Sequence, residues 1–198
     1  MARRSDHTRE ELYRMSLDAA REILRNQGLP ALTARSLAAR IGYSPGTLYN
    51  LFRNLDDLVV QLNGETLDAL QAALDAVPDD GDTETRLWHL ARAYIAFTVE
   101  NRELWNVLFE HRLPEGEDVP DWYRGKLARL LARVEAALVP VIPDDVAARG
   151  RATRVLWAGL HGLCSLGQSG KLALVAEDGL DDLARDLIRT YLAGLPGH

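Results

Sequence analysis

Apolar side chains recur along most of the chain at intervals of three and four residues, the spacing of one face of an α-helix. The first such row is Leu12, Met15, Ala19 and Ile23. Thr8 and Glu11 precede it with the spacing of a capping box, and Gly28 ends it. Runs of β-branched residues are scarce, and most glycines and prolines fall between the periodic segments. The pattern therefore predicts an all-α fold.

Residues 33–54 predict two short helices joined by a tight turn. Thr33 is an N-cap for the first helix, and Gly42 ends that helix with a turn. Ser44 is an N-cap for the second helix, and Pro45 takes the first helical position, where a missing N–H costs nothing. Three apolar side chains of the second helix face inward: Leu48, Leu51 and Phe52. The residues on its outer face are short and polar and leave the surface open, as a helix that enters a DNA major groove requires.

Apolar periodicity and capping residues predict six further helices, which brings the total to about nine. They cover about residues 55–77, 83–100, 102–112, 122–138, 145–169 and 180–195. Asp82 or Thr83 starts the second of these helices, and Asp144 or Asp145 caps the fifth. The acidic segment 113–120 contains prolines and a glycine and is predicted to be a mobile loop. The helix over 55–77 is long enough to link a small N-terminal domain, residues 1–54, with a larger domain, residues 55–198.

The segments LTARSLAARIG and YSPGTLYNLF closely resemble the DNA-binding helix-turn-helix of TetR-type bacterial repressors, the TetR/AcrR family. The resemblance covers the N-terminal quarter of the chain. It implies an all-helical homodimer with a homeodomain-like three-helix DNA-binding domain and a larger C-terminal domain for ligand binding and dimerisation. Two capped helices with a glycine turn also occur in proteins that bind no nucleic acid. Here the caps, the turn, the core positions and the open outer face all agree with DNA binding.

The predicted DNA contacts follow from side-chain chemistry and from the resemblance. Thr47 offers a methyl group or a hydroxyl to a base edge, and Asn50 suits adenine or a phosphate. Tyr49 matches a position at which family members often donate to a phosphate. The free N–H groups at the two helix starts suit phosphate oxygens. The predicted contacting residues are Thr33, Arg35, Ser44, Pro45, Gly46, Thr47, Tyr49, Asn50 and Arg53.

One position departs from the family pattern. Leu55 stands where the family often has a lysine just before its fourth helix. Either one phosphate contact is missing, or Arg53 replaces it.

The net charge of −6 argues against nucleic acid, but the distribution of charge reverses that conclusion. Residues 1–54 hold nine arginines and five acidic residues, whereas the remainder holds 14 basic and 24 acidic residues. The N-terminal part therefore concentrates the attraction for phosphate. Arg3 and Arg4 precede the first helix, either as an arm that reaches DNA or as a basic tail.

Aromatic side chains are frequent in the larger domain, where a helical bundle can hold an apolar cavity. By resemblance, we expect a small, largely hydrophobic effector between the fourth and eighth helices. Its expected lining is Tyr94, Trp105, Phe109, Tyr123, Trp157 and His161. The alternative is that these side chains simply fill the core.

The last two helices predict a dimer interface. Three glycines within the helical pattern of residues 155–170 suggest a close approach between helices, and the final helix carries two apolar rows. The WAGLHG segment also resembles a C-terminal subtype named for a Trp-His-Gly motif, here Trp157, His161 and Gly162. The predicted interface residues are Gly159, Gly162, Leu163, Leu187, Tyr191 and Leu195. The alternative is an ordinary helix pair in a monomeric core.

Nothing in the sequence supports an enzyme, a cofactor or a metal site. His161 and Cys164 lie three residues apart, but no second cysteine or paired histidine motif accompanies them. Residues 165–172 fail the P-loop pattern at the first glycine and at the final Ser/Thr. A single cysteine, a polar N-terminus and the lack of a long apolar run indicate a cytoplasmic protein with no membrane partner.

The sequence thus predicts a DNA-binding transcription regulator. We expect a homodimeric bacterial repressor that binds double-stranded DNA at a palindromic operator and is released by a small, largely hydrophobic ligand. The alternative is a helix-turn-helix protein without a small-molecule effector, gated by a protein partner.

Overall fold

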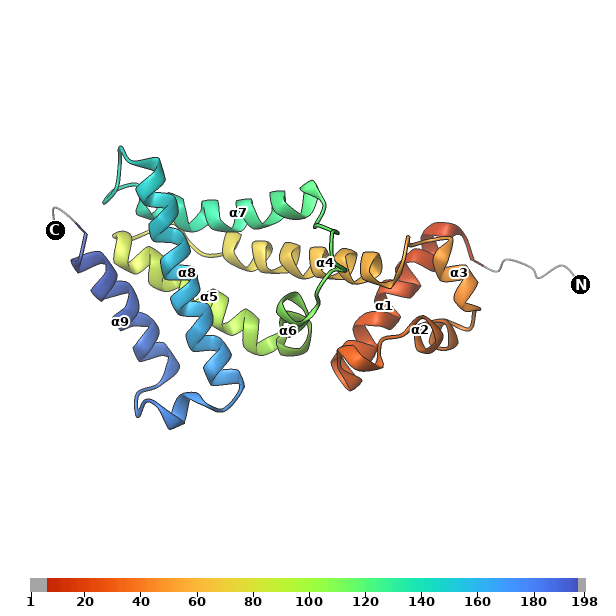
Figure 1. Cartoon of the computed structure of the whole chain (residues 1–198). Coiled ribbons are helices and arrows are strands. Elements are labelled where there is room, and N and C mark those ends of the chain that lie inside the picture. Colours follow the sequence, from red (N-terminus) through yellow and green to blue (C-terminus); the bar gives the residue numbers. More distant parts are fainter. Residues whose placement is uncertain (1–6, 196–198) are drawn as a thin grey trace, which may run out of the picture. The chain divides into compact units, whose positions relative to one another are not determined.

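The computed structural model describes residues 7–195 of the 198-residue chain (Figure 1). These residues form nine α-helices and two short 3-10 turns, with no strand among them, which confirms the all-α prediction. The helices are α1 (Arg9–Gln27), α2 (Ala34–Ile41), α3 (Pro45–Tyr49), α4 (Leu55–Asp75), α5 (Thr83–Glu100), α6 (Arg102–Glu110), α7 (Asp121–Leu138), α8 (Val146–Gln168) and α9 (Leu180–Ala193). The predictions for Arg3 and Arg4 lie outside the described residues. None of the described helices combines the length and the apolar character needed to cross a lipid bilayer.

Most helices begin where a capping side chain predicts them. The capping box of α1 is present, because Thr8 accepts from the backbone N–H of Glu11 and donates its own N–H to the Glu11 carboxylate. Asp82 caps α5 and Asp145 caps α8, each through a bond of 2.7–2.8 Å from the backbone three residues on. The 3-10 turns Leu29–Ala31 and Leu172–Leu174 were not predicted, since three residues are too short to show a period.

The chain packs as two compact units. The first comprises Met1–Thr66 and Glu103–Pro120, and the second comprises Leu67–Arg102 and Asp121–His198. The first unit therefore contains α1–α3, the first part of α4, and α6 with the loop that follows it. This packing unit extends beyond the division predicted after residue 54.

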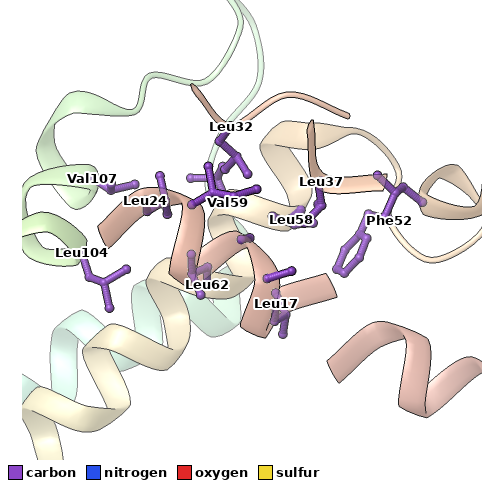
Figure 2. Close-up of a cluster of buried hydrophobic side chains, with 14 of the residues drawn as sticks. Leu17, Leu24, Leu32, Leu37, Phe52, Leu58, Val59, Leu62, Leu104 and Val107 are labelled. Carbon is purple, nitrogen blue, oxygen red and sulfur yellow. The ribbon is translucent and has the colours of Figure 1, made fainter. Parts of the chain in front are cut away.

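Apolar side chains of α1–α4 and α6 form one core in the first unit (Figure 2). Leu24 and Leu37 are fully buried within it, and Leu104 and Val107 reach it from α6. Leu104 and Val107 lie three residues apart and so share one face of their helix, and both are buried in this core. Residues of α2 and α3 therefore pack into the same core as residues of α1, α4 and α6.

The second unit is a bundle of α5, α7, α8 and α9 with the end of α4, in which α8 and α9 lie side by side (Figure 1). Gly159 permits that close approach, because a Cβ added there would lie 2.8 Å from Cδ2 of Leu187. One apolar row of α9 is buried: Ala184, Ile188 and Leu192. The other row is only partly buried: Leu183, Leu187 and Tyr191.

Candidate functional site

The turn between α2 and α3 depends on Gly42. This residue has φ 76° and ψ 24°, the left-handed conformation that glycine adopts without strain. The backbone N–H of Tyr43 returns to the Ala38 carbonyl at 2.9 Å, which ends α2 and sets the direction of α3. At the other end of α2, Thr33 caps the helix by accepting from the N–H of Ser36 at 3.0 Å, as predicted.

The start of α3 differs in one detail from the prediction. Ser44 occupies the N-cap position with extended backbone, but its side chain makes no capping hydrogen bond. Its Oγ lies 3.3 Å from Oγ1 of Thr47 instead. The two hydroxyls therefore stand together at the first turn of α3.

Helix α3 has a buried face and an open face. Leu48 is 4% exposed and Phe52, just beyond the helix, is 3% exposed, so both belong to the core of the first unit. Tyr49 is 59% exposed. Pro45, Gly46 and Asn50 are exposed too, whereas Thr47 is half-buried. A Cβ added to Gly46 would meet only Oγ of Ser44 at 3.8 Å, so this surface is open to a ligand.

The two arginines predicted to clamp phosphates have different surroundings. Arg35 is exposed on α2. Arg53 donates its backbone N–H to the Asp57 carboxylate at 2.9 Å, and its Nη2 lies 3.1 Å from Oε2 of Glu117. Glu117 was not predicted from the sequence, because no local pattern links residues 64 positions apart. Oδ1 of Asn54 accepts from the N–H of Asp57 at 2.7 Å, so Asn54 caps α4, which begins at Leu55.

Three of the predicted effector residues come together in the second unit. The Tyr94 hydroxyl lies 3.0 Å from Nδ1 of His161, and the Trp157 ring stacks on the His161 ring at 5.5 Å and 13°. Burial lowers the pKa of His161, and burial raises the pKa of Tyr94, with the neighbouring Cys164 adding to the rise. Both groups are therefore neutral at pH 7, and their hydrogen bond joins an uncharged phenol to an uncharged imidazole.

The other three predicted effector residues belong to α6 and α7. Trp105 and Phe109 belong to α6 in the first unit, where their rings meet edge to face at 5.3 Å. Tyr123 belongs to α7, and its burial raises its pKa to about 12. A separate cleft of about 700 Å³ lies between the ends of α5 and α9 and contains none of the six residues. The effector-binding role of the six residues stays a prediction.

The predicted dimer residues have different surroundings. Gly159 and Leu187 pack on each other within one chain, so the close approach predicted at Gly159 joins α8 to α9 of the same subunit. A Cβ added to Gly162 would meet nothing within 4 Å. The apolar members of the set are all partly exposed: Leu163, Leu187, Tyr191 and Leu195. Their role in a dimer stays a prediction.

The potential metal ligands do not gather. Among the described residues, no three His, Cys, Asp or Glu side chains are placed to hold a metal ion. Cys164 is a buried free thiol, and burial raises its pKa.

Comparison with known families shows which family the chain belongs to. Residues 17–62 match the family described as "Bacterial regulatory proteins, tetR family". Residues 87–191, just over half of the chain, match the "Tetracyclin repressor-like, C-terminal domain". The chain belongs to the TetR family. Members of the TetR family are DNA-binding transcription regulators and not enzymes, which confirms those two predictions. The Trp-His-Gly subtype stays a prediction.

Solved structures share this TetR fold over nearly the whole chain. A protein of unknown function from Rhodococcus sp. RHA1 has a TM-score of 0.76 and 22% identity, with 98% of each chain covered. FadR from Bacillus subtilis, in complex with stearoyl-CoA, has a TM-score of 0.69 and 14% identity, covering 92% of this chain and 99% of FadR. FadR from Thermus thermophilus, in complex with lauroyl-CoA, has a TM-score of 0.67 and 18% identity, covering 94% and 96%. A search of curated proteins finds no match.

Proposed function

We propose that this TetR-family regulator is a repressor that binds a palindromic operator as a homodimer and leaves it when a small, largely hydrophobic ligand binds. Its two α3 helices would face successive major grooves about 34–36 Å apart. Thr47 and Asn50 would read base edges. Tyr49, Arg35, Arg53 and the starts of α2 and α3 would contact phosphates.

The observation that carries this proposal is the division of α3 into two faces. Leu48 and Phe52 fix the helix to the core, while Tyr49 and Asn50 are turned outward. A five-residue helix with glycine and proline in its first turn presents little bulk, so backbone and side chains can both approach base edges.

The dimer proposal is supported by the partly exposed apolar row of α9. Leu187 and Tyr191 lie on this row, and Leu163 is partly exposed on the adjacent α8. A two-fold contact between α8 and α9 of two subunits would bury this row in each subunit and pair each surface with its own copy.

The ligand proposal is supported by the uncharged Tyr94–His161 pair beside Trp157. This group combines apolar ring surface with a few polar atoms, the composition of a small-molecule site. Two FadR proteins of the same fold hold acyl-CoA molecules, so acyl-CoA thioesters of different chain length are the first compounds to test. Release requires that the ligand bind the DNA-free conformation more tightly than the DNA-bound one.

The test is selection of bound duplexes from a random pool by the full-length protein, followed by acyl-CoA titration of the selected complex. We expect a consensus with two-fold symmetry whose half-sites are about 10 base pairs apart, or a multiple of that distance. A consensus without two-fold symmetry would reject the dimeric arrangement. A symmetric consensus that neither an acyl-CoA nor a small apolar compound releases would favour gating by a protein partner.

A further inference from the structure

Arg53 is held by a carboxylate from a distant loop. Its guanidinium Nη2 lies 3.1 Å from Oε2 of Glu117, in the acidic segment 113–120. The Arg53 side chain is 73% exposed, so a phosphate can reach the same guanidinium. Its backbone is fixed next to the core residue Phe52 by the bond to Asp57. The contact with Glu117 therefore involves only the guanidinium group of Arg53.

Glu117 is presented by a tight turn and not by a long free chain. The N–H of Glu117 donates to the Pro114 carbonyl at 3.0 Å, and Gly116 has φ +83°. The segment is also tied at its start, where Nε2 of His111 lies 2.8 Å from Oδ1 of Asp56 in the first turn of α4. The His111 side chain is only 10% exposed. These contacts keep the Glu117 carboxylate beside the junction of α3 and α4.

We propose that Glu117 competes with DNA for Arg53, so that the acidic segment 113–120 restrains binding to the phosphate backbone. A carboxylate and a phosphate bind a guanidinium through the same N–H donors. A phosphate that takes Arg53 must displace Glu117 or share the donors with it. Glu115 and Asp118 lie in the same segment and add negative charge near that contact. This inference rests on the proposed function, in which Arg53 approaches DNA.

The effect of the competition is modest, because the pair is exposed to water. Exposed ion pairs of this kind change an equilibrium by about 2- to 5-fold. Removing the Glu117 charge should therefore tighten DNA binding by about that factor. The contact with phosphate is independent of sequence, so a duplex of random sequence serves as the probe.

The experiment measures the Kd of the full-length protein for a fluorescent random-sequence duplex by anisotropy at about 50 mM salt. The test variant is Glu117→Gln, and the matched control is Glu115→Gln, which removes the same charge from the same turn. We expect Glu117→Gln to bind about 2- to 5-fold more tightly than wild type, and Glu115→Gln to gain less. In the Arg53→Ala background, Glu117→Gln should gain no more than Glu115→Gln does.

Equal gains for the two glutamine variants would overturn the proposal, because they would reflect net charge alone. A gain that persists without Arg53 would overturn it as well. Weaker binding by Glu117→Gln would show that Glu117 orients Arg53 toward the phosphate, the opposite role. Wild-type protein that ignores the duplex would reject DNA binding itself, and the competition with it.

Discussion

Replacing Phe52 and Tyr49 by alanine, one at a time, distinguishes the packing that holds α3 against the core from the surface that α3 exposes. The two aromatic residues lie three positions apart. Phe52 is 3% exposed and stacks on Tyr13 with ring centroids 4.9 Å apart, whereas Tyr49 is 59% exposed. We expect Phe52→Ala to act on folding and Tyr49→Ala to act on DNA binding.

The magnitudes follow from these environments. Truncation of a buried phenylalanine costs about 3–5 kcal/mol, of which the lost ring pair accounts for about 0.5–1.5 kcal/mol. A single domain is stable by about 5–15 kcal/mol, so the loss is a large fraction of the total. An exposed side chain such as Tyr49 changes the free energy of unfolding by about 0.5 kcal/mol or less. Loss of a hydrogen bond to a charged phosphate costs about 1.5–3 kcal/mol, which weakens DNA binding about tenfold or more.

Two assays distinguish the variants. Urea unfolding followed by circular dichroism gives the free energy of unfolding, and anisotropy with the selected operator gives the Kd. A Phe52→Ala variant within about 1 kcal/mol of wild type would refute the packing argument for the first unit. A Tyr49→Ala variant that is as unstable as Phe52→Ala, or that binds operator like wild type, would refute the DNA-facing role of Tyr49.

Three further predictions concern base recognition, dimer formation and the pH dependence of stability. Thr47→Ala or Asn50→Ala should cost about 1–3 kcal/mol on the selected operator and relax its sequence preference, measured by competition with variant duplexes. Gly162→Leu should overpack the interface and weaken the dimer about tenfold, measured by sedimentation. The control is Gly125→Leu, because a Cβ added to Gly125 also has nothing within 4 Å. This control should leave the sedimentation profile unchanged. Tyr123→Phe should reduce the loss of stability in alkali. Burial raises the pKa of Tyr123 to about 12, so as pH rises the phenol loses its proton in the unfolded state before it does in the folded state. The free energy of unfolding of the wild type should therefore fall between about pH 10 and about pH 12.

Each of these predictions has an outcome that contradicts it. Equal losses on operator and on random DNA would show that Thr47 and Asn50 read no bases. Dissociation by Gly125→Leu to the same degree as by Gly162→Leu would show a general folding defect and not an interface. An unfolding free energy that falls between pH 10 and 12 as steeply in Tyr123→Phe as in wild type would show that Tyr123 makes no contribution.

Helix starts were predictable because their hydrogen-bond partners are neighbours in the sequence. Thr8, Thr33, Asp82 and Asp145 each cap a helix through an N–H three residues on. The inward position of Leu48 followed from helical spacing in the same way. Ser44 was only half predictable: its place in the turn came from the pattern, but its hydroxyl meets Thr47 and not the backbone.

Pairings between distant residues were not predictable from one sequence. A helical period shows that Leu104 and Val107 share a face, but it does not show which core receives that face. The bond between Tyr94 and His161 joins residues 67 positions apart, and nothing local points to it. The same holds for Arg53 and Glu117, which only the packing of the first unit brings together.

The recruitment of α6 into the first core has a consequence for modular engineering. A chimera that takes residues 1–66 from this regulator and joins them to another effector domain would leave the pocket of Leu104 and Val107 unfilled. The transplanted DNA-binding unit would then contain an apolar cavity where these two side chains were buried. A functional graft must therefore bring residues 103–120 along, or supply an equivalent helix from the recipient.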